Sequence, residues 1–258
     1  MFHKKTRKSI VNFVGMTFTE DEAICIRHWD FSETSQTVGL FSRTHGLIRA
    51  IAKGARRERG GFSGGVDLLT RATITTVIKS GTDLATLSGW GLIENFPNIR
   101  REMRANKIAY FATDLVGRLF EAHDPHPNMY GAFLHLLRHI GSGGERSEMN
   151  DESRLLDFQW VALCEAGLQP ILGDCHTGVD VIHFDPRDGG RLVEKQTSTS
   201  WRVRVATIDV LEALRTGAVD TTASDESVIR ANRLLAAYIR DSIGEEPFTM
   251  RRLFGVLT

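Results

Sequence analysis

Cysteine and long hydrophobic runs are scarce in this sequence, and each scarcity excludes a class of protein. Three cysteines, Cys25, Cys164 and Cys175, are too few and too scattered in 258 residues for a disulfide framework, so we expect a reducing compartment. No uninterrupted apolar stretch approaches the roughly 18–20 residues that a membrane helix needs. We therefore expect a cytoplasmic protein without a membrane partner.

The basic start of the chain resembles the charged region of a signal peptide only in part. The apolar stretch that follows the basic residues is short and is broken by Asn12, and no small-residue cleavage site comes after it. We expect residues 1–15 to form a loose basic extension that can add weak phosphate contacts.

Motifs for catalysis are also missing. The sequence has no P-loop, no dinucleotide-binding glycine fingerprint and no Gly-x-Ser-x-Gly elbow. His135 and His139 stand four residues apart, but the Glu of a His-Glu-x-x-His motif is absent, and Cys175-His176 is only half of a zinc knuckle. We therefore predict no enzyme activity, no metal site and no cofactor. One alternative stays open, a hydrolase that recruits a metal to His123, Asp124 and His126.

The composition is typical of a globular protein with one large domain or two small ones. Hydrophobic residues make up 41% and charged residues 25% of the chain. The net charge is zero, but residues 1–107 hold 17 Lys and Arg against 10 Asp and Glu, an excess of +7 that the remainder balances with −7. A basic front half suggests an anionic partner at that end, although chance scatter explains the distribution equally well.

The first part of the chain has the pattern of short β-strands. We predict strands at residues 22–29, 36–43, 47–52, 72–79 and 84–90. Thr44-His45-Gly46 makes a tight connection in which Gly46 is able to adopt a positive φ, and residues 53–65 form a flexible basic loop. Closure into a small barrel is the economical arrangement for these five strands, because it removes the sheet edges.

After Pro97 the hydrophobic residues recur every three or four positions, which predicts helices. We place them at residues 99–121, 128–140, 153–166, 207–216, 224–243 and 249–256. Residues 141–150 read as a polar linker. The fold class is therefore α+β, with a five-stranded barrel over residues 16–97 and a mostly α-helical domain over residues 98–258. An irregular insertion lies around residues 171–200.

A basic cluster on the predicted barrel is the strongest functional signal. Six positive side chains lie within residues 43–59, opposed only by Glu58: Arg43, Arg49, Lys53, Arg56, Arg57 and Arg59. Such a density beside a flexible loop indicates a track for a phosphate backbone, and the alternative is an ordinary solvated face. Trp29, Phe31, Phe41 and Phe62 lie nearby and are able to stack on unpaired bases, but we expect Trp29 and Phe41 to fill the barrel core.

Three segments of the front half closely resemble the opening of the bacterial RecO family of DNA repair proteins. They read WDFSETS at residues 29–35, LFSRTHGL at 40–47 and AKGARR at 52–57, and Phe184-Asp185-Pro186 with Gly189-Gly190 resembles the family's C-terminal region. The resemblance implies that the barrel is an OB-fold. It also implies a recombination mediator in the nucleoid that binds single- and double-stranded DNA, anneals complementary strands, engages the single-stranded-DNA-binding protein and RecR, and helps to load the recombinase.

The resemblance assigns DNA binding to four of the six basic residues, Arg43, Lys53, Arg56 and Arg57, whereas charge and position alone add Arg49 and Arg59. Many members of the family also carry a zinc site of two Cys-x-x-Cys pairs. Here Cys175 matches the first position, but the other three are occupied by Gly178, Val193 and Gln196. We therefore expect zinc to be absent.

The implied partner protein has an acidic C-terminal tail with an apolar tip, so its receptor needs an apolar groove with a basic rim. Four basic residues of the first predicted helix are candidates for that rim: Arg100, Arg101, Arg104 and Lys107. A solvated helix face explains them equally well. The alternative function is an RNA-binding OB-fold protein with a helical interaction domain, because the physics of the barrel surface is the same for both.

Overall fold

The computed structural model describes residues 10–13, 16–57, 62, 65–79, 82–143, 147–173, 178–218 and 223–257. The chain divides into two compact units, one comprising Met1–Phe96 with Phe120–Gly131 and the other Pro97–Leu119 with Ala132–Thr258. The assignment of residues 120–131 to the first unit is a tertiary feature that the hydrophobic pattern did not indicate.

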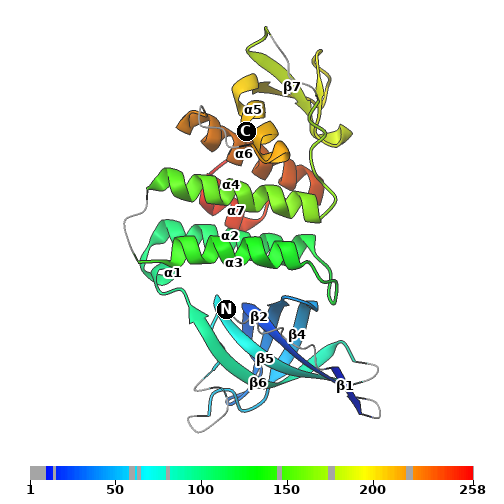
Figure 1. The fold of residues 1–258 in the computed structure, drawn as a ribbon, viewed down its shortest axis with the longest axis vertical. Helices are drawn as coiled ribbons and strands as arrows, with labels where there is room; N and C mark the ends of the chain where they lie inside the picture. The colour runs from blue at the N-terminus through cyan, green and yellow to red at the C-terminus, as the bar shows by residue number, and fades with distance from the viewer. Residues whose placement is uncertain are drawn as a thin grey trace, which may run out of the picture. The chain divides into compact units, whose positions relative to one another are not determined.

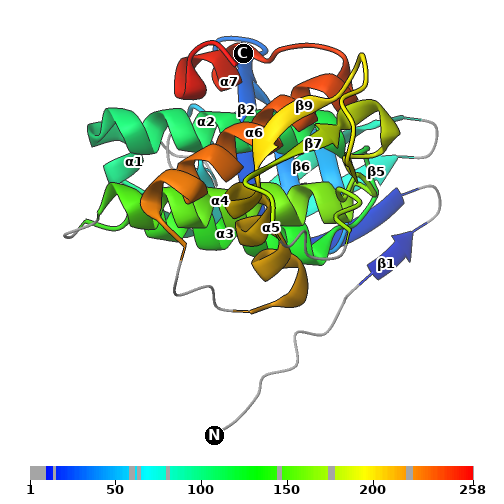
Figure 2. The ribbon, with the colours of Figure 1, turned by 90° about the horizontal axis from the view of Figure 1, so that it is seen from above.

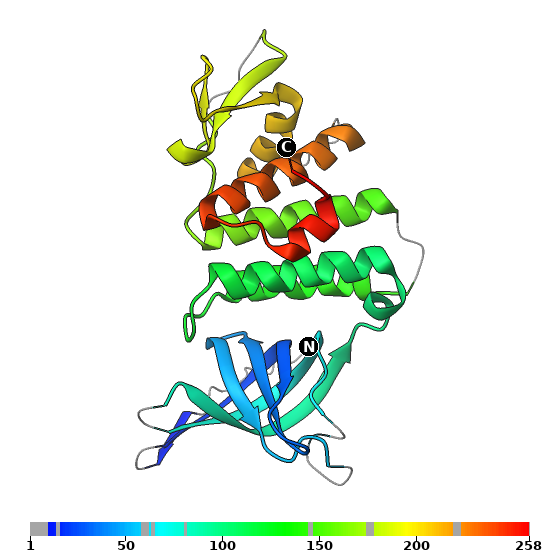
Figure 3. The ribbon, with the colours of Figure 1, turned by 180° about the vertical axis from the view of Figure 1, so that it is seen from behind.

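The first unit contains a closed five-stranded barrel (Figures 1 and 3). Its strands are β2 (Met16–Asp30), β3 (Gln36–Ser42), β4 (Gly46–Ala52), β5 (Thr70–Lys79) and β6 (Leu84–Asn95). They pair in the order β2-β3-β4-β6-β5, and β5 pairs again with β2 to close the barrel. The β4–β6 pair is parallel and the others are antiparallel. The predicted OB-fold barrel is confirmed, with β2 and β6 longer than the sequence pattern suggested.

Alternate residues of the strands fill the barrel. Val38 and Leu40 of β3 and Ile48 and Ala50 of β4 are buried in one hydrophobic cluster. Because successive side chains in a strand point to opposite faces, the residues between them, Gly39 and Arg49 among them, belong to the outer face.

A short strand, β1 (Ile10–Phe13), pairs antiparallel with the start of β2. The predicted loose extension over residues 1–15 is therefore wrong for residues 10–13, while residues 1–9 and 14–15 lie outside the described residues. Backbone pairing orders residues 10–13, because the edge of β2 offers unpaired N–H and C=O groups to a neighbouring segment.

The remaining chain is mainly helical, as predicted. The helices are α1 (Asn98–Arg101), α2 (Met103–Leu119), α3 (Pro127–Gly141), α4 (Glu148–Glu165), α5 (Val205–Thr216), α6 (Asp225–Ile243) and α7 (Phe248–Phe254). The predicted helix over residues 99–121 is interrupted at Glu102, whose backbone is extended. The predicted linker ends early, because Ser147 caps α4 by accepting a hydrogen bond from the Asn150 N–H. Among the described residues, no helix is long and apolar enough to cross a membrane.

Residues 171–200, expected to be irregular, contain most of a three-stranded sheet. Strands β7 (Val181–Asp185), β8 (Arg191–Val193) and β9 (Trp201–Arg204) pair antiparallel in the order β8-β7-β9. The prediction of an irregular segment is wrong because strands of three to five residues are too short to show a clear alternation.

Hydrogen bonds around Asp185 close this small sheet. The buried carboxylate accepts hydrogen bonds from the hydroxyls of Thr199, at 2.7 and 2.9 Å, and Thr197, at 2.8 Å. These bonds, that from Thr199 above all, hold the pKa of Asp185 below its ordinary value. The neighbouring Val193 pairs with His183 in the sheet, and neither it nor Gln196 carries a metal-binding side chain. The residues present do not fit a four-cysteine zinc site, and Cys175 lies outside the described residues.

Candidate nucleic-acid interface

A row of paired residues crosses four strands on the outer face of the barrel. Arg27 of β2 pairs with Gly39 of β3, Gly39 pairs with Arg49 of β4, and Arg49 pairs with Leu84 of β6. Residues paired across strands share a face of the sheet, and both arginines are exposed. We call these four residues the arginine row. The row places the guanidinium groups of Arg27 and Arg49 on one curved surface, on either side of Gly39.

The glycine in the arginine row keeps the surface between the two arginines low. A Cβ atom built at Gly39 would lie 3.3 Å from the Cβ of Arg27, which is tighter than ordinary van der Waals contact. A larger residue would therefore both push on Arg27 and fill the space that separates it from Arg49. Gly39 itself is buried, so the arginines on either side of it supply the exposed groups of the row.

Aromatic side chains continue this face toward the β2–β3 turn. Trp29 pairs with Thr37 two residues beyond the arginine row, and it is 48% exposed. Phe31 follows in the turn and is 63% exposed. Aromatic faces at the surface are the groups on which unpaired bases stack. The expectation that Trp29 fills the core is therefore wrong. Phe41 is fully buried, but outside the hydrophobic cluster of the barrel interior.

The turn after β4 adds three exposed cations next to these aromatics. Lys53, Arg56 and Arg57 are all exposed, and the Arg56 N–H donates to the Thr34 carbonyl of the β2–β3 turn. The Arg56 guanidinium also pairs with Asp30, and both side chains are well exposed. An exposed ion pair contributes only about 0–1 kcal/mol, so a phosphate is able to replace this carboxylate.

Arg43 lies at the opposite end of the β3–β4 hairpin from these cations. Gly46 and Ala52 are the two ends of β4 and are six residue steps apart, a length of roughly 20 Å at the usual rise of a strand. Arg43 is 3.8 Å from Glu22, and its side chain remains 56% exposed. The predicted basic residues therefore do not form one compact cluster: Arg49, Lys53, Arg56 and Arg57 share one region, Arg43 stands apart, and Arg59 lies outside the described residues.

The corner beside Arg43 is organised by a buried carboxylate. Asp21 accepts hydrogen bonds from the hydroxyl of Ser42, from the N–H and hydroxyl of Thr44 at 2.8 and 3.0 Å, and from a ring nitrogen of His45 at 3.1 Å. Burial alone would raise the pKa of the Asp21 carboxyl, but these hydrogen bonds hold it below its ordinary value. The Ser-Arg-Thr-His-Gly motif thus has a structural role, and its Arg43 is the member left exposed to a ligand.

Residues 120–131 cover the outer face at this corner. Phe41 contacts Phe120 and Tyr130, with ring centroids 6.5 and 5.8 Å apart, and the His123 N–H donates to the Leu47 carbonyl at 3.0 Å. Because Phe120 and Tyr130 cover the outer face at this corner, Phe41 is buried although it points away from the barrel interior. The arginine row is left as the accessible part of the face.

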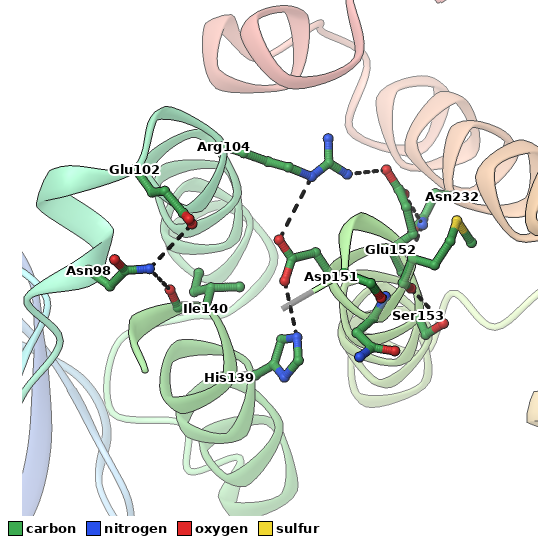
Figure 4. A network of polar contacts seen from close by, with 12 residues as sticks. Asn98, Glu102, Arg104, His139, Ile140, Asp151, Glu152, Ser153 and Asn232 are labelled. Carbon is green, nitrogen blue, oxygen red and sulfur yellow. Dashed lines mark hydrogen bonds and ion pairs between the residues drawn. The ribbon is translucent and has the colours of Figure 1, made fainter. Parts of the chain in front are cut away.

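The basic residues proposed for a partner have different environments (Figure 4). The Arg104 guanidinium pairs with Glu152 and lies 3.8 Å from Asp151, which also contacts His139 at 3.1 Å. Its charge is therefore already balanced by two carboxylates. Arg100 and Arg101 are exposed on α1, and Lys107 is half-buried on α2.

Two further candidates for chemistry are the His126–Asp124 pair and the thiol of Cys25. His126 contacts Asp124 at 3.1 Å in an exposed pair, and no group of three or more His, Cys, Asp or Glu able to hold a metal occurs among the described residues. Burial raises the pKa of the Cys25 thiol to about 12, so it stays protonated and unreactive near neutral pH.

Sequence reasoning missed one residue of this interface, Arg27. Simple alternation from the buried Cys25 places residues 27 and 29 inside the barrel, but the pairing register shifts between Cys25 and Arg27. Such a bulge inserts one residue and turns the side chains that follow to the other face. In the sequence, the positive charge of Arg27 is the one sign that this residue does not point into the apolar interior of the barrel.

Comparison with known proteins identifies the family of this chain. The family model described as Recombination protein O N terminal matches residues 16–96, and that described as Recombination protein O C terminal matches residues 100–252. Similar proteins, each named DNA repair protein RecO, occur in Myxococcus xanthus and Rhodopirellula baltica. The first is 28% identical over 87% of this chain and 92% of its own length, and the second is 31% identical over 75% and 72%. An OB-fold barrel followed by a helical region, matched by both family models, shows that the chain belongs to the RecO family of DNA repair proteins.

Proposed function

We propose that this protein is a recombination mediator that binds single- and double-stranded DNA on the outer face of its barrel and anneals complementary strands. In this role it engages the single-stranded-DNA-binding protein and RecR and helps to load the recombinase. The observation that carries the proposal is the accessible arginine row, continued by exposed Trp29 and Phe31 and by the cations of the turn after β4.

Annealing needs no covalent chemistry, only relief of the repulsion between two polyanions while bases search for partners. The planar guanidinium groups of Arg27 and Arg49 suit this task because each can contact a phosphate with two parallel hydrogen bonds and displace condensed counterions. Stacking of unpaired bases on Trp29 and Phe31 would hold the strand with its Watson–Crick edges uncovered. These contacts leave the bases available to a second strand.

Charge reversal beside the aromatics tests this assignment. Arg56→Glu combined with Arg57→Glu should abolish binding of a single-stranded oligonucleotide, because both side chains are exposed and the variant adds negative charge next to Asp30. The matched control is Arg191→Glu with Arg215→Glu, which makes the same charge change at exposed arginines of the second unit. Unchanged retention of the oligonucleotide by the first variant would refute the interface.

A fluorescent annealing assay tests the function itself. Complementary strands coated with the cognate single-stranded-DNA-binding protein should anneal faster with the wild-type protein and with the control variant than with the Arg56/Arg57 variant. Binding of RNA and DNA with equal affinity, without any acceleration of annealing, would support the RNA-binding alternative instead.

We also propose that α1 and the start of α2 receive the acidic tail of the single-stranded-DNA-binding protein, with Arg100, Arg101 and Lys107 as the basic rim, whereas Arg104 is already paired with Glu152. Arg100→Ala with Lys107→Ala is the sharper test, because removal of Arg104 would leave buried Asp151 without its cation. Tail-peptide affinity should fall severalfold in this double variant. Equal affinity would remove the α1–α2 face as the receptor.

A further inference from the structure

A pocket in the second unit has the composition of an anion site. It has a volume of about 540 Å³ and lies between β9, α6 and Leu257, which follows α7. In Figure 2, β9 lies alongside α6. Five arginines line it and no carboxylate does: Arg202, Arg204, Arg230, Arg233 and Arg240. This concentration of one charge favours a negatively charged ligand.

Most of this positive charge is not balanced within the described part of the chain. Arg230 pairs with Glu226, but Arg233 donates to the carbonyls of Phe254 and Val256 at 2.7 and 3.0 Å, and Arg240 donates to that of Leu257 at 2.8 Å. Carbonyl dipoles position these two guanidinium groups without neutralising them. The exposed Arg202 and Arg204 of β9 have no carboxylate partner among the described residues.

The start of α5 adds to the preference for an anion. Arg204 is the N-cap residue of this 12-residue helix, and its side chain makes no capping hydrogen bond. Thr207, in the first turn, lines the pocket and is 1% exposed, and its hydroxyl has no hydrogen-bond partner. The N-terminal end of a helix attracts anions, and a buried hydroxyl without a partner is destabilising unless a ligand or water satisfies it.

The apolar part of the pocket suggests which anion it accepts. Trp201 lines it while stacking on Phe184, with ring centroids 5.8 Å apart and an interplanar angle of 21°. Val203 and Leu234 supply further apolar walls. A volume of 540 Å³ is within the usual range of roughly 300–1,000 Å³ for a small-molecule site. Arginines for phosphate and a fixed aromatic ring for a base are together what a nucleotide requires.

We propose that this pocket binds a nucleotide, with its phosphates on the arginines of β9 and α6 and its base against Trp201. The nucleotide comes either from a free nucleoside triphosphate or from the 5′-phosphorylated end of a strand. This site is separate from the barrel interface, and it does not depend on the proposed annealing function.

Titrations of the full chain with ATP, and with one oligonucleotide carrying either a 5′-phosphate or a 5′-hydroxyl, test the proposal. The main variant is Arg202→Ala with Arg204→Ala, since both side chains are exposed and their removal leaves the sheet intact. Arg191→Ala, on β8 at the other edge of the same sheet, is the matched control, and Arg49→Ala removes a barrel contact instead. Thermal unfolding verifies that each variant is folded.

If the ligand is a free nucleotide, the Arg202/Arg204 variant should bind ATP at least roughly tenfold more weakly than the wild-type protein. ATP binding should stay unchanged in Arg191→Ala and in Arg49→Ala. If it is a strand end, the wild-type protein should prefer the 5′-phosphate, and the Arg202/Arg204 variant alone should lose that preference. The proposal is overturned if neither ATP nor the 5′-phosphate shows binding that depends on Arg202 and Arg204. An acidic peptide is titrated as a third probe, and the proposal is also overturned if it alone binds in a way that depends on these two residues.

Discussion

Neutralising Arg49 should reduce the salt dependence of DNA binding by a defined amount. Five exposed cations belong to the interface on the barrel: Arg27, Arg49, Lys53, Arg56 and Arg57. If each contacts one phosphate of a single strand, the slope of log affinity against log salt is about −3.5, because each contact contributes about −0.7. Arg49→Gln removes one contact and should bring the slope to about −2.8.

This difference is large enough to measure. Between about 50 and 200 mM salt, the affinity of the wild-type protein should fall roughly 130-fold and that of the variant roughly 50-fold. Fluorescence anisotropy with a labelled oligothymidine reports both slopes. The substitution should change stability by no more than about 0.5 kcal/mol, because Arg49 is exposed on the outer face of β4.

The matched control is Arg191→Gln, an exposed arginine of the second unit that pairs with Asp188. Its slope should equal that of the wild-type protein. Two results would refute the reasoning: a slope that stays at the wild-type value in Arg49→Gln, or an equal reduction in the control. The first would mean that Arg49 touches no phosphate, and the second that net charge rather than position determines binding.

Three further predictions concern the stacking surface, the hairpin corner and acid stability. Trp29→Ala should weaken binding of an unpaired strand by about 1–3 kcal/mol and affect duplex much less, since bases within a duplex are not available to stack; competition titrations compare the two. Gly46→Ala should destabilise the protein by more than the roughly 1–2 kcal/mol of a left-handed backbone, because its Cβ would lie 2.1 Å from the Asp124 carbonyl oxygen. Gly131→Ala, with open space around it in α3, should instead stabilise by about 0.5–1 kcal/mol, and urea denaturation of both variants measures the contrast. The pKa of Asp21 lies below its ordinary value of 3.8, so its stabilising effect should be complete above that value and be lost as pH falls through the lower folded-state pKa. Asp21→Asn should be less stable at neutral pH, and its stability should approach that of the wild-type protein in acid; parallel curves in pH-dependent unfolding would contradict this.

The amino-acid sequence by itself determined the local features of this protein. Alternating hydrophobic residues indicated the five barrel strands, the change of period after Pro97 indicated helices, and Gly46 was expected at a turn with positive φ, which is observed at 67°. These features depend on neighbouring residues, so they can be inferred without knowing what the strands and helices pack against. The motif around residues 42–46 is different, because its Ser42, Thr44 and His45 are held by Asp21, which is more than twenty residues away in the sequence.

Only the tertiary structure decided which side chains share a surface. The register shift after Cys25 turned Arg27 and Trp29 outward, and strand pairing then brought Arg27 and Arg49 to the same row. Two carboxylates of α4 balanced the charge of Arg104, which the sequence alone presented as available. Long-range pairing of this kind depends on residues far apart in the chain, and a shift of one residue reverses the face to which every later side chain belongs.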